Sequence, residues 1–131
     1  MSQPEPPHQP HRIDVPFLLH AAERLPGDPR VDDYGPLYAA VARVYARAMD
    51  RDIYGSHHLK GAALLQTLVK IPCLERSNEA YAWHCTEAFL ALGGHRLDYA
   101  PKAAVALVRD AATGTVGVAQ MARQLRAWTI S

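Results

Sequence analysis

Residues 56–92, SHHLKGAALLQTLVKIPCLERSNEAYAWHCTEAFLAL, decide the fold, because they place two apolar segments on either side of one polar stretch. Ser56 is a suitable helix N-cap, and a mostly apolar run from Gly61 to Val69 follows it. The sequence Ile71-Pro72 ends this run, because a residue before proline is disfavoured in the helical region. The pattern therefore predicts a largely buried helix over 57–70.

A second helix is predicted from Asn78 to Leu92. Ser77 is expected to cap it, and Gly93-Gly94 stops it. The polar loop from Lys70 to Asn78 thus connects two helices that both contribute to the core.

Four further helices are expected on either side of this pair. Asp14 can cap the first of them, and Pro101 and Gly114 are a typical start and stop for another. The predicted ranges are 15–24, 34–49, 101–113, and from 115 or 116 to about 128. The sequence therefore predicts an all-α fold, a compact single-domain bundle of about six helices over residues 13–131.

Residues 1–12 differ in composition from the rest of the chain. They contain Pro4, Pro6, Pro7 and Pro10 and only one apolar residue, and proline lacks the backbone donor that helices and ladders require. We expect a disordered Pro/His-rich leader here.

The overall composition restricts the class of protein. The chain has 131 residues, 49% of them hydrophobic, with a formal charge of +1. It has no apolar run near the ~20 residues that cross a bilayer and no signal segment. Cys73 and Cys85 form no C-x-x-C motif, so we expect reduced thiols in a cytoplasmic protein. A weakly charged chain is also a poor DNA binder, so we expect neither DNA nor a membrane as a partner.

The loop between the two central helices is the candidate binding site. Unpaired N–H groups and the positive dipole end at a helix start favour an anion such as phosphate. We predict that Lys70, Arg76, Ser77 and Asn78 bind an anion or nucleotide there. The alternative is an ordinary capped helix that follows a solvated loop.

Three other segments give a family resemblance. The turn Leu25-Pro26-Gly27, with VARVYAR at 41–47, resembles the N-terminal part of the Fic/Doc (Fido) family, and AATG at 111–114 is similar to its C-terminal turn. The resemblance implies a toxin component that transfers a phosphoryl or AMP group from ATP, or another nucleoside triphosphate, to a hydroxyl of a protein target. It also implies Mg²⁺ as a cofactor and restraint by an antitoxin peptide similar to Phd.

The family motif H-x-F-x-[DE]-[GA]-N-x-R is degenerate in this chain. Its histidine, aromatic, acidic, small, asparagine and arginine positions correspond to Pro72, Leu74, Arg76, Ser77, Asn78 and Ala80. Proline cannot act as the general base that the motif histidine supplies. Arginine at the acidic position would repel Mg²⁺ but attract phosphate, and alanine removes the final phosphate clamp.

No replacement for the lost histidine is evident, so the catalytic residue is left unassigned. The candidates considered are Glu75, His57, His58 and His84. A zinc site built from Cys73, Cys85 and His84 has no recognised ligand spacing, so no metal site is predicted.

Three functional hypotheses follow. The first is a Fic/Doc-type transferase, and the second is a non-catalytic module on the same scaffold that binds a nucleotide, an anion or a partner. The third is a helix-turn-helix over residues 101–127, which would lack a recognition helix free to enter the groove. We therefore expect no DNA binding from this segment.

Overall fold

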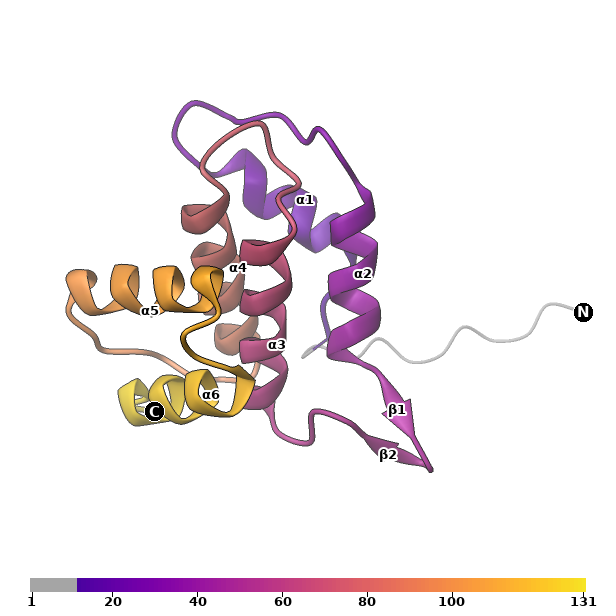
Figure 1. The fold of residues 1–131 in the computed structure, drawn as a ribbon, viewed down its shortest axis with the longest axis vertical. Helices are drawn as coiled ribbons and strands as arrows, with labels where there is room; N and C mark the ends of the chain where they lie inside the picture. The colour runs from indigo at the N-terminus through magenta and orange to yellow at the C-terminus, as the bar shows by residue number, and fades with distance from the viewer. Residues whose placement is uncertain (1–11) are drawn as a thin grey trace, which may run out of the picture.

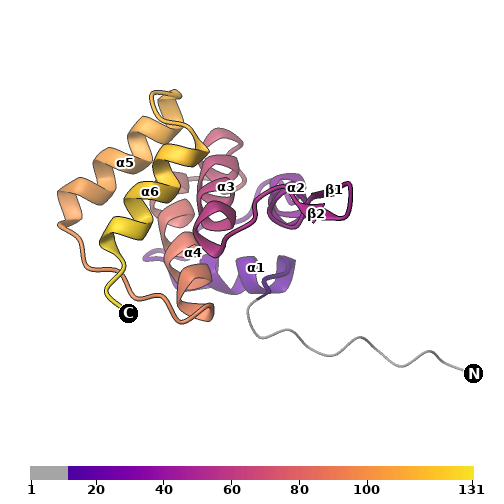
Figure 2. The same cartoon turned by 90° about the horizontal axis from the view of Figure 1, so that it is seen from below.

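Helix α3 (His57–Lys70) lies at the centre of a computed structural model that describes residues 12–131. It packs against α2 (Gly35–Val44), α4 (Asn78–Leu92), α5 (Pro101–Thr113) and α6 (Val118–Trp128) (Figure 1). Helix α1 (Val15–Glu23) packs on α4 and α2. Viewed from below, α5 and α6 lie on one side of α3, and α1 and α2 lie on the other (Figure 2). The prediction of a compact, all-α bundle of about six helices is confirmed.

The α3–α4 pair forms the middle of the core, as the apolar segments predicted. Within α3, Gly61 lies at a close approach of the two helices, because a Cβ built there would be 3.2 Å from Leu90 Cδ2. Phe89 and Leu90 of α4 are fully buried at this contact. A glycine that would otherwise weaken the helix thus allows the two backbones to approach.

Several predicted helix boundaries are confirmed by the hydrogen bonds that form them. Asp14 Oδ1 accepts from Phe17 N at 2.9 Å, and Ser56 Oγ accepts from Leu59 N at 3.1 Å. Gly114 ends α5 in the left-handed region, at φ 82°. The last helix begins at Val118 rather than 115 or 116, so the turn after Gly114 is longer than predicted.

The prediction of one helix over 34–49 is wrong at its C-terminal end. Helix α2 ends at Val44, and a hairpin of β1 (Arg47–Ala48) and β2 (Arg51–Asp52) follows it. Met49 and Asp50 form its turn, with φ values of 53° and 62°. Glycine or asparagine normally occupies such positions, so the sequence carried no turn signal here. An ion pair of 2.9 Å between Arg47 and Asp52 links the two strands.

The predicted leader lies outside the described residues, apart from Arg12. Its guanidinium carbon lies 3.8 Å from the centroid of the Tyr45 ring, a cation–π contact. Among residues 12–131, no helix is long and apolar enough to cross a membrane.

Candidate functional site

The loop between α3 and α4 lies beside the connection from α1 to α2, at one end of the bundle (Figure 1). The carbonyl of Cys73 accepts hydrogen bonds from Asp32 N at 2.8 Å and Asp33 N at 3.2 Å. Glu75 N donates to the Arg30 carbonyl at 3.0 Å, and Glu75 Oε1 accepts from Arg30 N at 3.2 Å. These contacts join segments more than forty residues apart, so no local sequence pattern could reveal them.

Asn78, the residue predicted to match the asparagine of the family motif, holds the loop closed. Its Oδ1 accepts from Cys73 N at 3.1 Å and from Leu74 N at 3.0 Å. Its Nδ2 donates to the Leu74 carbonyl at 3.0 Å. Both acceptor positions of the amide are therefore used within the loop, and only one donor is left for any ligand.

Ser77 precedes α4, but the prediction that its side chain caps this helix is wrong. Its backbone is left-handed, with φ 65° and ψ 28°, and its side chain makes no capping hydrogen bond within the described chain. A serine caps a helix from the extended region, where its oxygen reaches the N–H groups two or three residues ahead. In the turn that Asn78 closes, Ser77 instead has the left-handed conformation, from which its side chain does not reach those N–H groups.

Arg76 is held by the α1–α2 connection. Its Nη2 donates to the Gly27 carbonyl at 2.7 Å, and its Nη1 pairs with Glu75 Oε1 at 2.5 Å. Gly27 has φ 81°, and a Cβ built there would lie 2.8 Å from Arg76 Nη2. The Leu25-Pro26-Gly27 turn and the loop are thus matched to each other, which the sequence alone did not predict.

The structure brings together three of the four predicted anion-binding residues. Arg76, Ser77 and Asn78 are consecutive at the start of α4, whereas Lys70 ends α3. Lys70 Nζ is directed toward the turn after α5, where a Cβ built on Gly114 would lie 3.5 Å from it. A role for these four residues in anion binding stays a prediction.

The other motif positions carry no group that could perform the family's chemistry. Pro72 is exposed, Leu74 is buried with 4% of its surface exposed, and Ala80 is exposed in the first turn of α4. The donor set does not fit Mg²⁺, because Arg76 carries a positive charge where an acidic ligand would stand. We therefore derive no reaction step through a metal ion at this loop.

The three candidate histidines do not lie at the loop. His57 and His58 begin α3, whereas the loop follows its end, about 20 Å away along the helix axis at about 1.5 Å per residue. His84 is half-buried in the middle of α4. Glu75 is in the loop, but its Oε1 already accepts from Arg30 N and Arg76.

Three histidines form a cluster at the far end of the bundle. His58 is buried, its Nε2 lies 2.9 Å from Thr129 Oγ1, and its ring centroid lies 4.5 Å from that of His95. Burial, followed by the electrostatic effects of His95, Arg126 and His57, lowers the pKa of His58 from 6.5 to about 4. His58 is therefore neutral in the folded protein at neutral pH.

This depressed pKa predicts a loss of stability in acid. The unfolded chain takes up the proton near pH 6.5 and the folded chain only near pH 4, so His58 imposes no cost on folding above pH 6.5 and an increasing cost as the pH falls toward 4. The free energy of unfolding should fall as the pH drops from 6.5 to 4. Urea titrations between pH 7 and 4 measure it. A His58→Gln variant should lose this part of the pH dependence, and an unchanged slope would contradict the assignment.

The two cysteines behave as core residues. Burial raises the pKa of the Cys73 thiol to about 11 and that of Cys85 to about 12. Both are free thiols, and no group of three or more His, Cys, Asp or Glu side chains among residues 12–131 could hold a metal ion. The thiols are therefore poor nucleophiles, since the thiolate is the reactive form.

Comparison with known proteins identifies the family. No protein-family model matches the chain. A protein named Toxin Doc, from Mycolicibacterium smegmatis, is 36% identical over 101 residues, which cover 76% of this chain and 78% of that relative. The resemblance inferred from the L-P-G turn, the following helix and the A-A-T-G turn is thereby confirmed, and the chain belongs to the Doc toxin family.

Proposed function

We propose that this Doc-family protein is a binding module in which the motif loop has become structural and group transfer is lost. One observation carries the proposal: the amide of Asn78 is bonded to the backbone of Cys73 and Leu74. The position of the motif histidine is Pro72, which can accept no proton. The residues that would have to handle phosphate and a hydroxyl are therefore absent or already bonded.

The partner expected for such a module is an antitoxin peptide, similar to Phd in having an acidic, helix-forming tail. The relative's name supports this, because a toxin that is made by its own cell has to be restrained. The bundle that would receive the peptide is complete over the described residues, since all six helices form and the L-P-G turn is bonded to Arg76. Partner binding needs this scaffold and no general base.

A second candidate function is nucleotide or anion binding without turnover. It is favoured by the start of α4, where Ser77 provides no side-chain cap and the N–H groups of the first turn remain available to a ligand. Arg76 lies one residue earlier and would add charge to the site. Glu79 in the first turn opposes an anion, although its carboxylate lies 3.7 Å from Arg109 Nε.

Label transfer tests the loss of catalysis. The full chain is incubated with Mg²⁺, ATP labelled at the α- or γ-phosphate, and a bacterial lysate. We expect no labelled protein above background. Transfer that is abolished by Arg76→Gln or Asn78→Ala, and kept by the exposed control Arg123→Gln, would overturn the proposal and restore the transferase assignment.

Co-expression tests the binding role. The chain is produced together with the product of a small adjacent gene whose C-terminal tail is acidic and helix-forming, and a stable complex is expected to co-purify. Deleting the acidic tail should abolish the complex. A complex that survives the deletion, or none with the intact tail, would contradict the proposed partner.

Calorimetry of the chain with ATP, without Mg²⁺, tests the second candidate function.

A further inference from the structure

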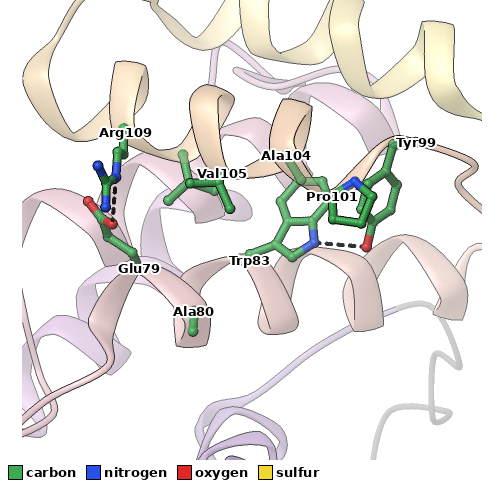
Figure 3. A pocket seen from close by; sticks show the side chains of 9 residues that line it. Glu79, Ala80, Trp83, Tyr99, Pro101, Ala104, Val105 and Arg109 are labelled. Atoms are coloured by element: carbon green, nitrogen blue, oxygen red, sulfur yellow. Dashed lines mark hydrogen bonds and ion pairs between the residues drawn. The ribbon is translucent and has the colours of Figure 1, made fainter.

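A pocket of about 480 Å³ lies between α4 and α5, outside the motif loop (Figure 3). Its lining is mostly apolar, with two aromatic side chains and one ion pair. The lining residues are Glu79, Ala80, Trp83, Tyr99, Pro101, Ala104, Val105, Val108 and Arg109. A pocket of this size and composition falls within the range that holds one small molecule.

Small side chains keep this space open. Ala80 on α4 and Ala104 on α5 both line the pocket, so neither helix fills the space between them. Val105 also lines it and is 53% exposed, which leaves an apolar surface in contact with solvent. Burying this surface against a ligand would be favourable, in proportion to the apolar area removed from water.

The aromatic end of the pocket is fixed in place. Trp83 Nε1 donates to Tyr99 Oη at 3.0 Å, and that hydroxyl donates to Glu87 Oε1 at 2.7 Å. The Trp83 and Tyr99 rings meet edge to face, with centroids 5.1 Å apart and planes at 87°. These bonds hold the indole in one orientation, so a ligand need not order it on binding.

The charges at the pocket compensate each other. Glu79 Oε2 and Arg109 Nε lie 3.7 Å apart at the end opposite Tyr99 (Figure 3). The Trp83 N–H and the Tyr99 hydroxyl are already bonded to each other and to Glu87. The pair is partly exposed to solvent, and its two charges cancel, so the lining carries no net charge with which to balance a charged ligand. Burying a charge without an opposite partner is costly.

We propose that this pocket binds a small, uncharged, flat aromatic molecule. The ligand would pack against the indole of Trp83 in a stacked or edge-to-face arrangement and contact Val105 on α5. The site shares no residue with the loop at 70–78, but it includes Ala80, which corresponds to the last motif position, and Glu79 in the first turn of α4. The proposal does not rest on the binding of an antitoxin peptide.

Calorimetry with three naphthalene probes of similar size tests the proposal. The probes are 2-naphthol, which is uncharged, 2-naphthoate, which is an anion, and 2-naphthylmethylammonium, which is a cation. We expect 2-naphthol to bind one site with a Kd of about 0.1–1 mM, in the range usual for a ligand of this size. Each charged probe should bind at least tenfold more weakly.

A matched pair of variants locates the site. Ala80→Leu extends a side chain into the pocket and should weaken 2-naphthol binding at least tenfold. Ala91→Leu makes the same change at an exposed alanine of the same helix outside the pocket and should leave the Kd unchanged. Leucine is a good helix former, so both variants should keep their circular dichroism spectrum.

Three results would overturn the proposal. They are no binding of 2-naphthol at 1 mM, equal binding by the two leucine variants, and tighter binding of either charged probe than of 2-naphthol. The last result would indicate that the Glu79–Arg109 pair opens to receive a charge.

Discussion

Replacing Asn78 with alanine should lower the free energy of unfolding by about 3 kcal/mol, because a buried turn loses its hydrogen-bond partner. The backbone N–H groups of Cys73 and Leu74 would lose their acceptor, and both residues are almost fully buried, at 1% and 4% exposed. Buried donors left without a partner cost more than an average hydrogen bond contributes. Urea denaturation followed by circular dichroism measures this loss.

Ser77→Ala is the matched control for this prediction. If Ser77 capped α4, its removal would cost about 1 kcal/mol. Because its side chain makes no capping bond, we expect a change within about 0.5 kcal/mol. Asn78→Asp keeps the acceptor but loses the bond to the Leu74 carbonyl, so its cost should be intermediate. A larger loss for Ser77→Ala than for Asn78→Ala would show that the loop is closed differently.

Phe89→Ala should destabilise the protein by about 3–5 kcal/mol, the usual cost of truncating a buried aromatic side chain. Phe89 is fully buried where α3 and α4 meet. Its ring stacks on that of His57 with centroids 4.1 Å apart, and its carbonyl lies 2.8 Å from His57 Nε2. The truncation removes contacts that the Phe89 ring makes with both α3 and α4. The cavity that it leaves lies deep in the core, where small shifts of the neighbouring side chains cannot refill it.

Phe89→Leu provides the comparison. It keeps most of the buried volume and should cost less than half as much as the alanine variant, as measured by the same denaturation. A loss below about 1 kcal/mol for Phe89→Ala would mean that the α3–α4 contact contributes little to the core.

The erosion of the motif is consistent with a fold that does not depend on catalysis. Asn78, the residue predicted to match the motif, is the one whose side chain closes the loop. Of the positions that depart from the motif, Pro72, Arg76 and Ala80 are exposed and Leu74 is buried. A structural constraint on Asn78 is sufficient to account for its presence here.

Local chemistry in the sequence defined the central helices. Ser56 caps α3 and Pro72 follows its end, so the predicted range 57–70 agrees with the structure. The bounds of α4, from Asn78 to Leu92, are also confirmed. Capping residues, prolines and glycines act within a few positions along the chain, which is why the sequence alone reveals their effect.

The β1–β2 hairpin could not be predicted from capping residues and helix breakers. Ala48 continues the apolar spacing of α2, but the chain turns at Met49 and Asp50, which take left-handed conformations without being glycine. Lys60 Nζ holds the second strand by a 3.0 Å ion pair with Asp52, a contact formed only when α3 is in place.

The sequence by itself determined the helical class, the limits of α3 and α4, and the membership of the Doc family, because caps, breakers and motif spacing are local properties. Only the tertiary structure decided that Asn78 and Arg76 are bonded within the protein and that α4 and α5 enclose a pocket. The Arg76–Gly27 bond and the pocket depend on the approach of segments far apart in the chain, which leaves no trace in local spacing. The Asn78 bonds reach only four or five residues back, but they form only where the backbone folds into this turn, which no capping or breaker residue signals.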